Sequence, residues 1–141
     1  TAGSLSELGD MVKGPIIITN GDVITDIKYF DILKFHIKNK AAATMAVKVH
    51  EIQNPFGVVE TDGIEIVEFE EKPVYRSKVN AGIYIINPSI IDTFMKKPEF
   101  IDMPDLIKKA INYKKKVHAF PIHEDWDDAG NEKLKKILKI K

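Results

Sequence analysis

The first third of the chain alternates between fully apolar runs and a segment with helical spacing. The run from Pro15 to Thr19 is apolar at nearly every position and predicts a strand buried on both faces, as in a parallel sheet. Asp26 to Lys40 carries apolar residues near helical spacing, with Asp26 as the expected cap. Residues 44–49 predict another buried strand. This strand–helix–strand order predicts a right-handed parallel crossover.

The middle of the chain has a different pattern. Residues 56–60 predict a strand, Asp62-Gly63 a turn, and residues 64–70 a second strand in which apolar residues alternate with glutamates. Together they predict a hairpin with one solvent-facing side. Residues 79–86 predict a further strand.

Helix signals dominate the last third. Pro88 precedes a short predicted helix over residues 89–96, and Asp102 is the expected cap of a helix over residues 103–113. A strand follows over residues 117–122. The last element is a helix over residues 132–139 that Asn131 would cap.

The whole pattern predicts a single α/β domain over residues 1–141 with a mixed sheet flanked by helices. Only a short helical segment, residues 4–11, precedes the first strand. A strand with two apolar faces needs neighbours, so we expect the sheet to have an exposed edge there. Such an edge invites pairing with another copy of the chain.

Composition narrows the classes of function. The 21 basic and 21 acidic residues balance, which argues against nucleic acid or an anionic membrane surface as partner. The chain has no cysteine, so a thiolate metal site and a cysteine nucleophile are excluded, and a cytoplasmic location is expected. No apolar run approaches the roughly 18 residues that a membrane span needs. The four histidines share no metal-ligand spacing, and His36 and His50 fit surface positions.

Two acidic loops directly follow predicted strands. Asn20-Gly21-Asp22 follows the first strand, and Trp126-Asp127-Asp128-Ala129-Gly130 follows the last. Ligands of open α/β sheets bind beyond the carboxyl ends of strands, and Mg²⁺ takes one or two carboxylates together with phosphate oxygens and water. Each loop taken alone is more often an ordinary turn.

Two further segments carry polar groups suited to a sugar phosphate. Glu71 and Lys72 precede Pro73, and a lysine ammonium binds phosphate as a point charge. Asn80-Ala81-Gly82 begins a strand, and an amide side chain both donates and accepts hydrogen bonds. A solvated acidic face and a bulge are the ordinary alternatives.

In combination these segments resemble the sugar-1-phosphate nucleotidyltransferases, the enzymes that make NDP-sugars, over essentially the whole chain. Glucose-1-phosphate thymidylyltransferases and mannose-1-phosphate guanylyltransferases are examples, and residues 101–106 and 120–122 resemble the guanylyltransferase type. The six matching segments, in chain order, are Thr1-Ala2-Gly3-Ser4-Leu5, Asn20-Gly21-Asp22, Pro55-Phe56-Gly57-Val58-Val59, Glu70-Glu71-Lys72-Pro73, Asn80-Ala81-Gly82-Ile83-Tyr84 and Trp126-Asp127-Asp128-Ala129-Gly130.

The resemblance implies a fold and a set of roles. The fold would be Rossmann-like, of the glycosyltransferase-A type, with its N-terminal strands missing from this chain. Asp22 and Asp128 would hold Mg²⁺ between the phosphates, and Asp22 and Lys72 would be the catalytic groups. The substrate-binding residues would be Ala2, Gly3, Gly57, Glu71, Asn80 and Gly82.

The departures from the family pattern qualify the expected function. The Gly-rich basic loop that holds the triphosphate in this family has no counterpart here, so we expect the chain alone to be inactive and its parent to join an NTP and a sugar 1-phosphate, in polysaccharide biosynthesis. Asp127 stands where the family often has an apolar residue, which leaves Asp127 as an alternative to Asp128. The other reading of the chain is a non-catalytic remnant that binds NDP-sugars or a partner.

Overall fold

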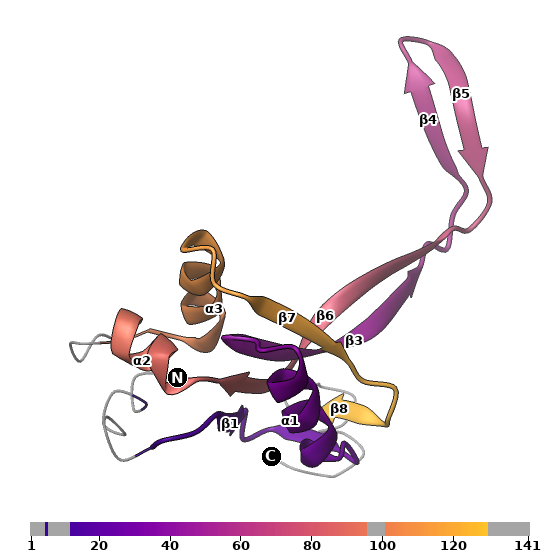
Figure 1. Ribbon diagram of the computed structural model, residues 1–141. Coiled ribbons are helices and arrows are strands. Elements are labelled where there is room, and N and C mark those ends of the chain that lie inside the picture. The colour runs from indigo at the N-terminus through magenta and orange to yellow at the C-terminus, as the bar shows by residue number, and fades with distance from the viewer. Residues whose placement is uncertain (1–4, 6–11, 96–100, 130–141) are drawn as a thin grey trace.

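The computed structural model describes residue 5, residues 12–95 and residues 101–129 of the chain (Figure 1). The helices predicted over residues 4–11 and 132–139 lie outside this part, apart from Leu5. The elements are β1 (Ile16–Thr19), β2 (Val23–Thr25), α1 (Tyr29–Lys38), β3 (Ala43–Gln53), β4 (Val58–Asp62), β5 (Glu65–Glu70), β6 (Val74–Ile86), α2 (Pro88–Phe94), α3 (Met103–Asn112), β7 (Val117–Pro121) and β8 (Trp126–Asp128).

The main sheet has four strands in the order β1-β6-β3-β7. β6 runs antiparallel to both of its neighbours, and β3 and β7 are parallel. β1 and β3 therefore run in the same direction, as the crossover prediction requires, but β6 lies between them. β1 is an edge strand of the described sheet, and Ile17 on it is exposed, so its predicted burial on both faces is not seen in this part of the chain.

Alternating residues of β6 divide the core into two clusters. Ile83 and Ile85 pack with Ile32 of α1 on one face of the sheet. Tyr84 and Ile86 pack with residues of α2 and α3 on the other, including Leu106. Helices thus cover both faces of a mixed sheet, which confirms the predicted fold class. Among the described helices none is long and apolar enough to cross a membrane.

The predicted helix ends are partly confirmed. Asp102 caps α3, because its side chain accepts a 2.8 Å hydrogen bond from the amide of Asp105, and Pro88 stands in the first turn of α2. The prediction that Asp26 caps α1 is wrong. The helix begins at Tyr29, with Lys28 at the cap position and no capping side chain. Asp26 lies three residues before the helix, out of reach of the first-turn amides.

His36 is buried, which corrects its predicted surface position. Its Nδ1 lies 2.8 Å from the Thr44 hydroxyl and its Nε2 lies 3.1 Å from the Asn87 side-chain oxygen. The Asn87 amide group in turn donates to the carbonyl of Ala41. These hydrogen bonds give both ring nitrogens of His36 a partner and link α1 to β3 and to the start of α2. The hydrophobic pattern of the sequence does not reveal such bonds.

The β3–β6 ladder extends well beyond the packed body and ends in the predicted hairpin (Figure 1). β4 and β5 pair antiparallel, with a bulge between Glu60 and Thr61. Every residue of the two strands except Val58 is exposed. The hairpin and its alternation are confirmed, but both of its faces are open in the described part of the chain, not only the polar one.

Candidate functional site

β1 ends where the Asn20-Gly21-Asp22 loop meets the start of the buried half of β6. The amide of Asn20 donates a 2.8 Å hydrogen bond to the carbonyl of Gly82. Gly82 has φ +72°, and a Cβ there would lie 2.9 Å from both Asn20 Nδ2 and Val23 Cγ2. Only glycine fits this conformation and this space, which explains the glycine of the Asn80-Ala81-Gly82 segment.

The two acidic loops are joined by a small sheet that the sequence pattern did not predict. β2 and β8 pair antiparallel, with Val23 opposite Asp128, and the amide of Ala129 donates a 2.8 Å hydrogen bond to the carbonyl of Asp22. By ordinary strand geometry this puts the Cα atoms of Asp22 and Asp128 about 6 Å apart. We call residues 20–22, 80–82 and 126–129 the aspartate corner.

Trp126 fixes this corner to the main sheet. Its indole nitrogen donates a 2.8 Å hydrogen bond to the carbonyl of Ala81, and its ring packs against the α1 side of the core. The bond ties β8 to the same glycine-containing segment that Asn20 contacts. The predicted asparagine, aspartate and tryptophan loops therefore form one structural unit.

Asp127 and Asp128 take different positions. Asp127 pairs with Ile24 and lines a hollow of about 290 Å³ together with Asp26 and Asp125. Asp22 lines a separate cavity of about 590 Å³, whose other walls are Ile18, Thr19, Asn20, Gly21 and Met103. Successive residues of a strand point to opposite faces, so Asp127 and Asp128 point to opposite sides of the β2–β8 pair, with Asp128 on the side of Val23.

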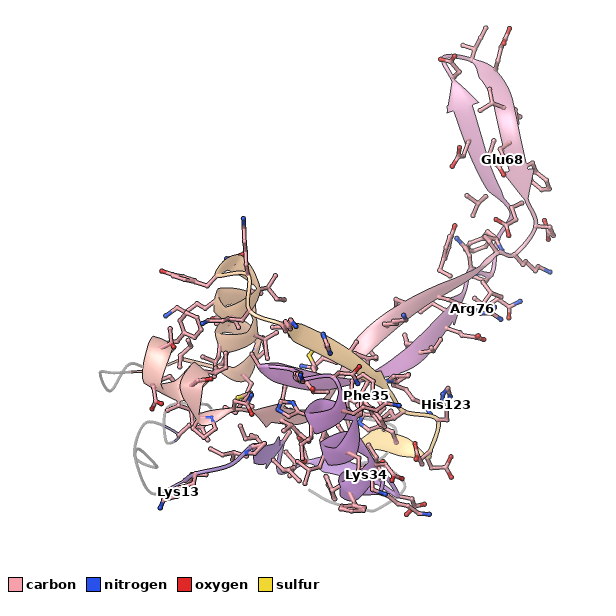
Figure 2. The ribbon with its side chains drawn as sticks, viewed as in Figure 1. Lys13, Lys34, Phe35, Glu68, Arg76 and His123 are labelled. Atoms are coloured by element: carbon pink, nitrogen blue, oxygen red, sulfur yellow. The ribbon has the colours of Figure 1, made fainter. Side chains whose placement is uncertain are left out.

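Lys48 of β3 holds the loop that leads into β8. Its ammonium donates to the carbonyls of Glu124, at 2.7 Å, and His123, at 3.3 Å. The main-chain amides of Glu124 and His123 hydrogen-bond the Glu124 carboxyl and lower its pKa. Figure 2 shows His123 in this loop, between β7 and β8.

Asn80 stands at the junction of the exposed and buried halves of β6. Its side chain donates a 2.6 Å hydrogen bond to the Tyr84 hydroxyl and accepts one from the amide of Gly82. Burial raises the pKa of the Tyr84 phenol, and the bond from Asn80 partly offsets this rise in pKa. Asn80, which was predicted to bind the sugar, therefore uses its side chain to hold the turn at Gly82.

Gly57, Glu71 and Lys72 gather at the base of the hairpin and form what we call the hairpin base. A Cβ at Gly57 would lie 2.8 Å from the Phe69 ring and 2.9 Å from a Glu71 carboxylate oxygen. Lys72 has φ +49°, and its ammonium lies 3.8 Å from the Glu71 carboxylate. Both side chains are more than half exposed, so this pair contributes little to stability.

The structure does not bring the aspartate corner and the hairpin base together. They lie at different points of the β3–β6 ladder, and the residues from Val74 to Asn80 alone span about 20 Å at the usual rise of a strand. Figure 1 shows the hairpin extending away from the body that carries β2 and β8.

The donor set of the corner suits a magnesium ion better than a metal held by protein ligands alone. Within the described residues no group of three or more histidines, cysteines, aspartates and glutamates is arranged to hold a metal. The open cavity beside Asp22, in a loop joined to the Asp128 loop through the backbone, matches an ion that completes its shell with phosphate oxygens and water.

The predicted site and the structure differ at several residues. Ala2 and Gly3, which were predicted to contact the nucleotide, are outside the described residues. Lys48 and the Trp126 indole were not predicted as fixing groups, because both act on carbonyls of residues far along the chain. For Lys48 the sequence offers one signal, a lysine among the apolar residues of a predicted buried strand.

Comparison with known proteins gives a consistent picture. A family model described as "Nucleotidyl transferase" matches residues 1–138. The mannose-1-phosphate guanylyltransferase catalytic subunit beta of Dictyostelium discoideum is 34% identical over 140 residues, covering 94% of this chain and 38% of that protein. A glucose-1-phosphate adenylyltransferase of Clostridium perfringens (strain 13 / Type A) is 35% identical over 127 residues, covering 82% of this chain and 32% of the relative.

Solved structures agree on the fold. The crystal structure of HddC from Yersinia pseudotuberculosis complexed with GMP-PN superposes with a TM-score of 0.67 at 18% identity, over 100% of this chain and 62% of the other. The chain spans about two fifths or less of the length of the curated relatives it matches.

Proposed function

Because the chain belongs to the nucleotidyl transferase family, we propose that it forms the metal- and sugar-binding part of a protein that makes an NDP-sugar. The reactants would be an NTP and a sugar 1-phosphate, with pyrophosphate as the second product. The observation that carries the proposal is the β2–β8 pairing, which joins the Asp22 and Asp128 loops by hydrogen bonds next to an open cavity.

The reaction needs positioned charge more than covalent chemistry. A phosphate oxygen of the sugar 1-phosphate forms a bond to the α-phosphorus of the nucleotide, and the bond to the β-phosphate oxygen breaks. Asp22 and Asp128 would hold a Mg²⁺ ion, which when bound neutralises phosphate charge. Asp128 is the ligand that the family resemblance implies, and Asp127, which stands opposite Ile24 and lines a different cavity from Asp22, is the alternative.

The hairpin base would supply the sugar side. Lys72 would neutralise the sugar phosphate, and Glu71 would accept hydrogen bonds from sugar hydroxyls. Asn80 and the backbone at Gly57 and Gly82 would shape the pocket, and Ala2 and Gly3 would contact the nucleotide. Among the relatives, the mannose and guanyl names favour a mannose phosphate and GTP.

The distance between the two parts of the site favours binding without turnover by this chain alone. Lys72 and Asp22 must face one substrate for transfer, and they are held apart here. A non-catalytic NDP-sugar-binding role therefore remains the second candidate function.

A melting experiment tests the proposal. The purified chain is heated with a panel of NDP-sugars and NTPs, with and without Mg²⁺, and a folded-state ligand at 100 times its Kd would add about 2.7 kcal/mol of stability. We expect an NDP-sugar to raise the Tm in the presence of Mg²⁺, with no NDP-sugar formed in a transfer assay. No shift with any nucleotide would contradict binding, and efficient turnover would contradict the need for a further segment.

A further inference from the structure

The hairpin carries a concentrated negative charge. Residues 54–71, which we call the acidic hairpin, contain six acidic residues and no basic one. Two cross-strand pairs bring like charges directly opposite each other, Glu60 with Glu68 and Asp62 with Glu65. Like charges in such positions destabilise a strand pair, so a cationic surface against this face would stabilise the hairpin.

The other face of the acidic hairpin is apolar. Val59 pairs with Phe69, and Thr61 pairs with Ile66. Phe69 and Ile66 are 61% and 67% exposed, respectively. A two-stranded hairpin without cover is marginally stable in water, so this face also calls for a partner.

A complementary surface lies on the packed body. Residues 108–116, the lysine corner, contain five lysines and no acidic residue. They end α3 and lead into β7, an edge strand of the described sheet. Residues 111–116 are all exposed, and Ile111 and Tyr113 add apolar surface beside Lys114, Lys115 and Lys116.

The two surfaces do not meet within one molecule. Figure 1 shows the hairpin projecting from the far end of the β3–β6 ladder, away from α3, and Figure 2 shows Glu68 on it well beyond Arg76 of the ladder. Two hairpins would repel each other, because both are acidic. A second copy offers the opposite charge together with exposed apolar side chains.

We propose that the acidic hairpin of one chain docks on the lysine corner of a second copy of the same chain. Two such contacts related by a two-fold axis close a dimer. This interface differs from pairing through the β1 edge, and it does not depend on the proposed enzymatic function. It uses neither Asp22 nor Asp128 nor Lys72.

Charge reversal in the full 141-residue chain tests the proposal. Sedimentation velocity is measured for the wild type, for Glu60→Lys/Glu68→Lys, and for Lys114→Glu/Lys115→Glu/Lys116→Glu. We expect the wild type to form a dimer whose Kd weakens about tenfold or more between low and high salt. Each variant alone is expected to be monomeric, and an equimolar mixture of the two is expected to form a heterodimer through the unaltered hairpin of one variant and the unaltered lysine corner of the other.

Matched controls separate docking from general charge effects and misfolding. Two control variants make the same number and kind of charge changes elsewhere, on α1, α2 and the turn after α1. They are Asp31→Lys/Asp92→Lys and Lys34→Glu/Lys38→Glu/Lys40→Glu, and both should dimerise like the wild type. Restored association in the mixture shows that both reversed variants are folded. A monomeric wild type, a dimer that survives either reversal, or a mixture that stays monomeric would overturn the proposal.

Discussion

The main-chain amide of Ala129 donates a 2.8 Å hydrogen bond to the carbonyl of Asp22. These residues are more than 100 positions apart in the chain, and each stands at the end of a loop rich in acidic or amide side chains. The bond extends the β2–β8 pairing by one position and makes the two loops a single corner.

Gly82→Ala should destabilise the fold by about 1–3 kcal/mol, because alanine at φ +72° is strained and its Cβ would meet Asn20 and Val23. Urea unfolding followed by the fluorescence of Trp126, the one tryptophan, measures this. Gly14→Ala is the matched control, since a Cβ at Gly14 meets no atom within 4 Å. Equal stability of the two variants would contradict the packing described at Gly82.

Lys48→Met should loosen the loop before β8, because the carbonyls of His123 and Glu124 lose a charged donor. We expect a loss of about 1 kcal/mol and faster hydrogen exchange of the β8 amides. Lys78→Met, an exposed change on the neighbouring strand, is the control. If the β8 amides exchange at the wild-type rate in Lys48→Met, the bonds from Lys48 do not hold the loop before β8.

Asp102→Ala should remove the cap of α3 and cost about 1 kcal/mol of unfolding free energy. Chemical denaturation gives this value directly. Asp92→Ala, in α2, makes the same substitution away from a cap position and should be close to neutral. A neutral Asp102→Ala would mean that the α3 terminus is satisfied in another way.

Tyr84 should make stability sensitive to alkaline pH. Burial raises the pKa of this phenol above 10.0, so the folded state keeps the proton more tightly than the unfolded state does. Its contribution is complete below pH 10 and is lost as the pH rises through the raised pKa. Between pH 9 and 11 the wild type should lose more stability than Tyr84→Phe. Parallel losses in the two proteins would argue against a buried, titrating Tyr84.

The sequence predicted most elements because their signals are local. The alternation of residues 64–70, the cap at Asp102 and the proline at residue 88 each depend on neighbours within a few positions. Strand order is different, since the insertion of β6 between β1 and β3 depends on pairing across the whole chain. The burial of His36 likewise depends on Thr44 and Asn87, which no periodicity reveals.

In the candidate site, too, local motifs were predictable and contacts between distant segments were not. The motif residues Asn20, Asp22, Asn80, Gly82 and Asp128 could be selected from the sequence, and the structure places them in one corner. The three-residue strands β2 and β8 are too short for a hydrophobic pattern, so their pairing was not predictable. Lys72 lies far from this corner because the β3–β6 ladder is long. The strands predicted over residues 44–49 and 79–86 were both shorter than the observed β3 and β6.

The central claim is that Asp22 and Asp128 together form a magnesium-dependent nucleotide site. The most direct measurement is the Mg²⁺-dependent rise in Tm with an NDP-sugar, compared among the wild type, Asp22→Asn, Asp128→Asn and the matched control Asp127→Asn. The account predicts that Asp22→Asn and Asp128→Asn abolish the rise while Asp127→Asn keeps it. A rise that survives in Asp128→Asn, or that is lost only in Asp127→Asn, would contradict the account.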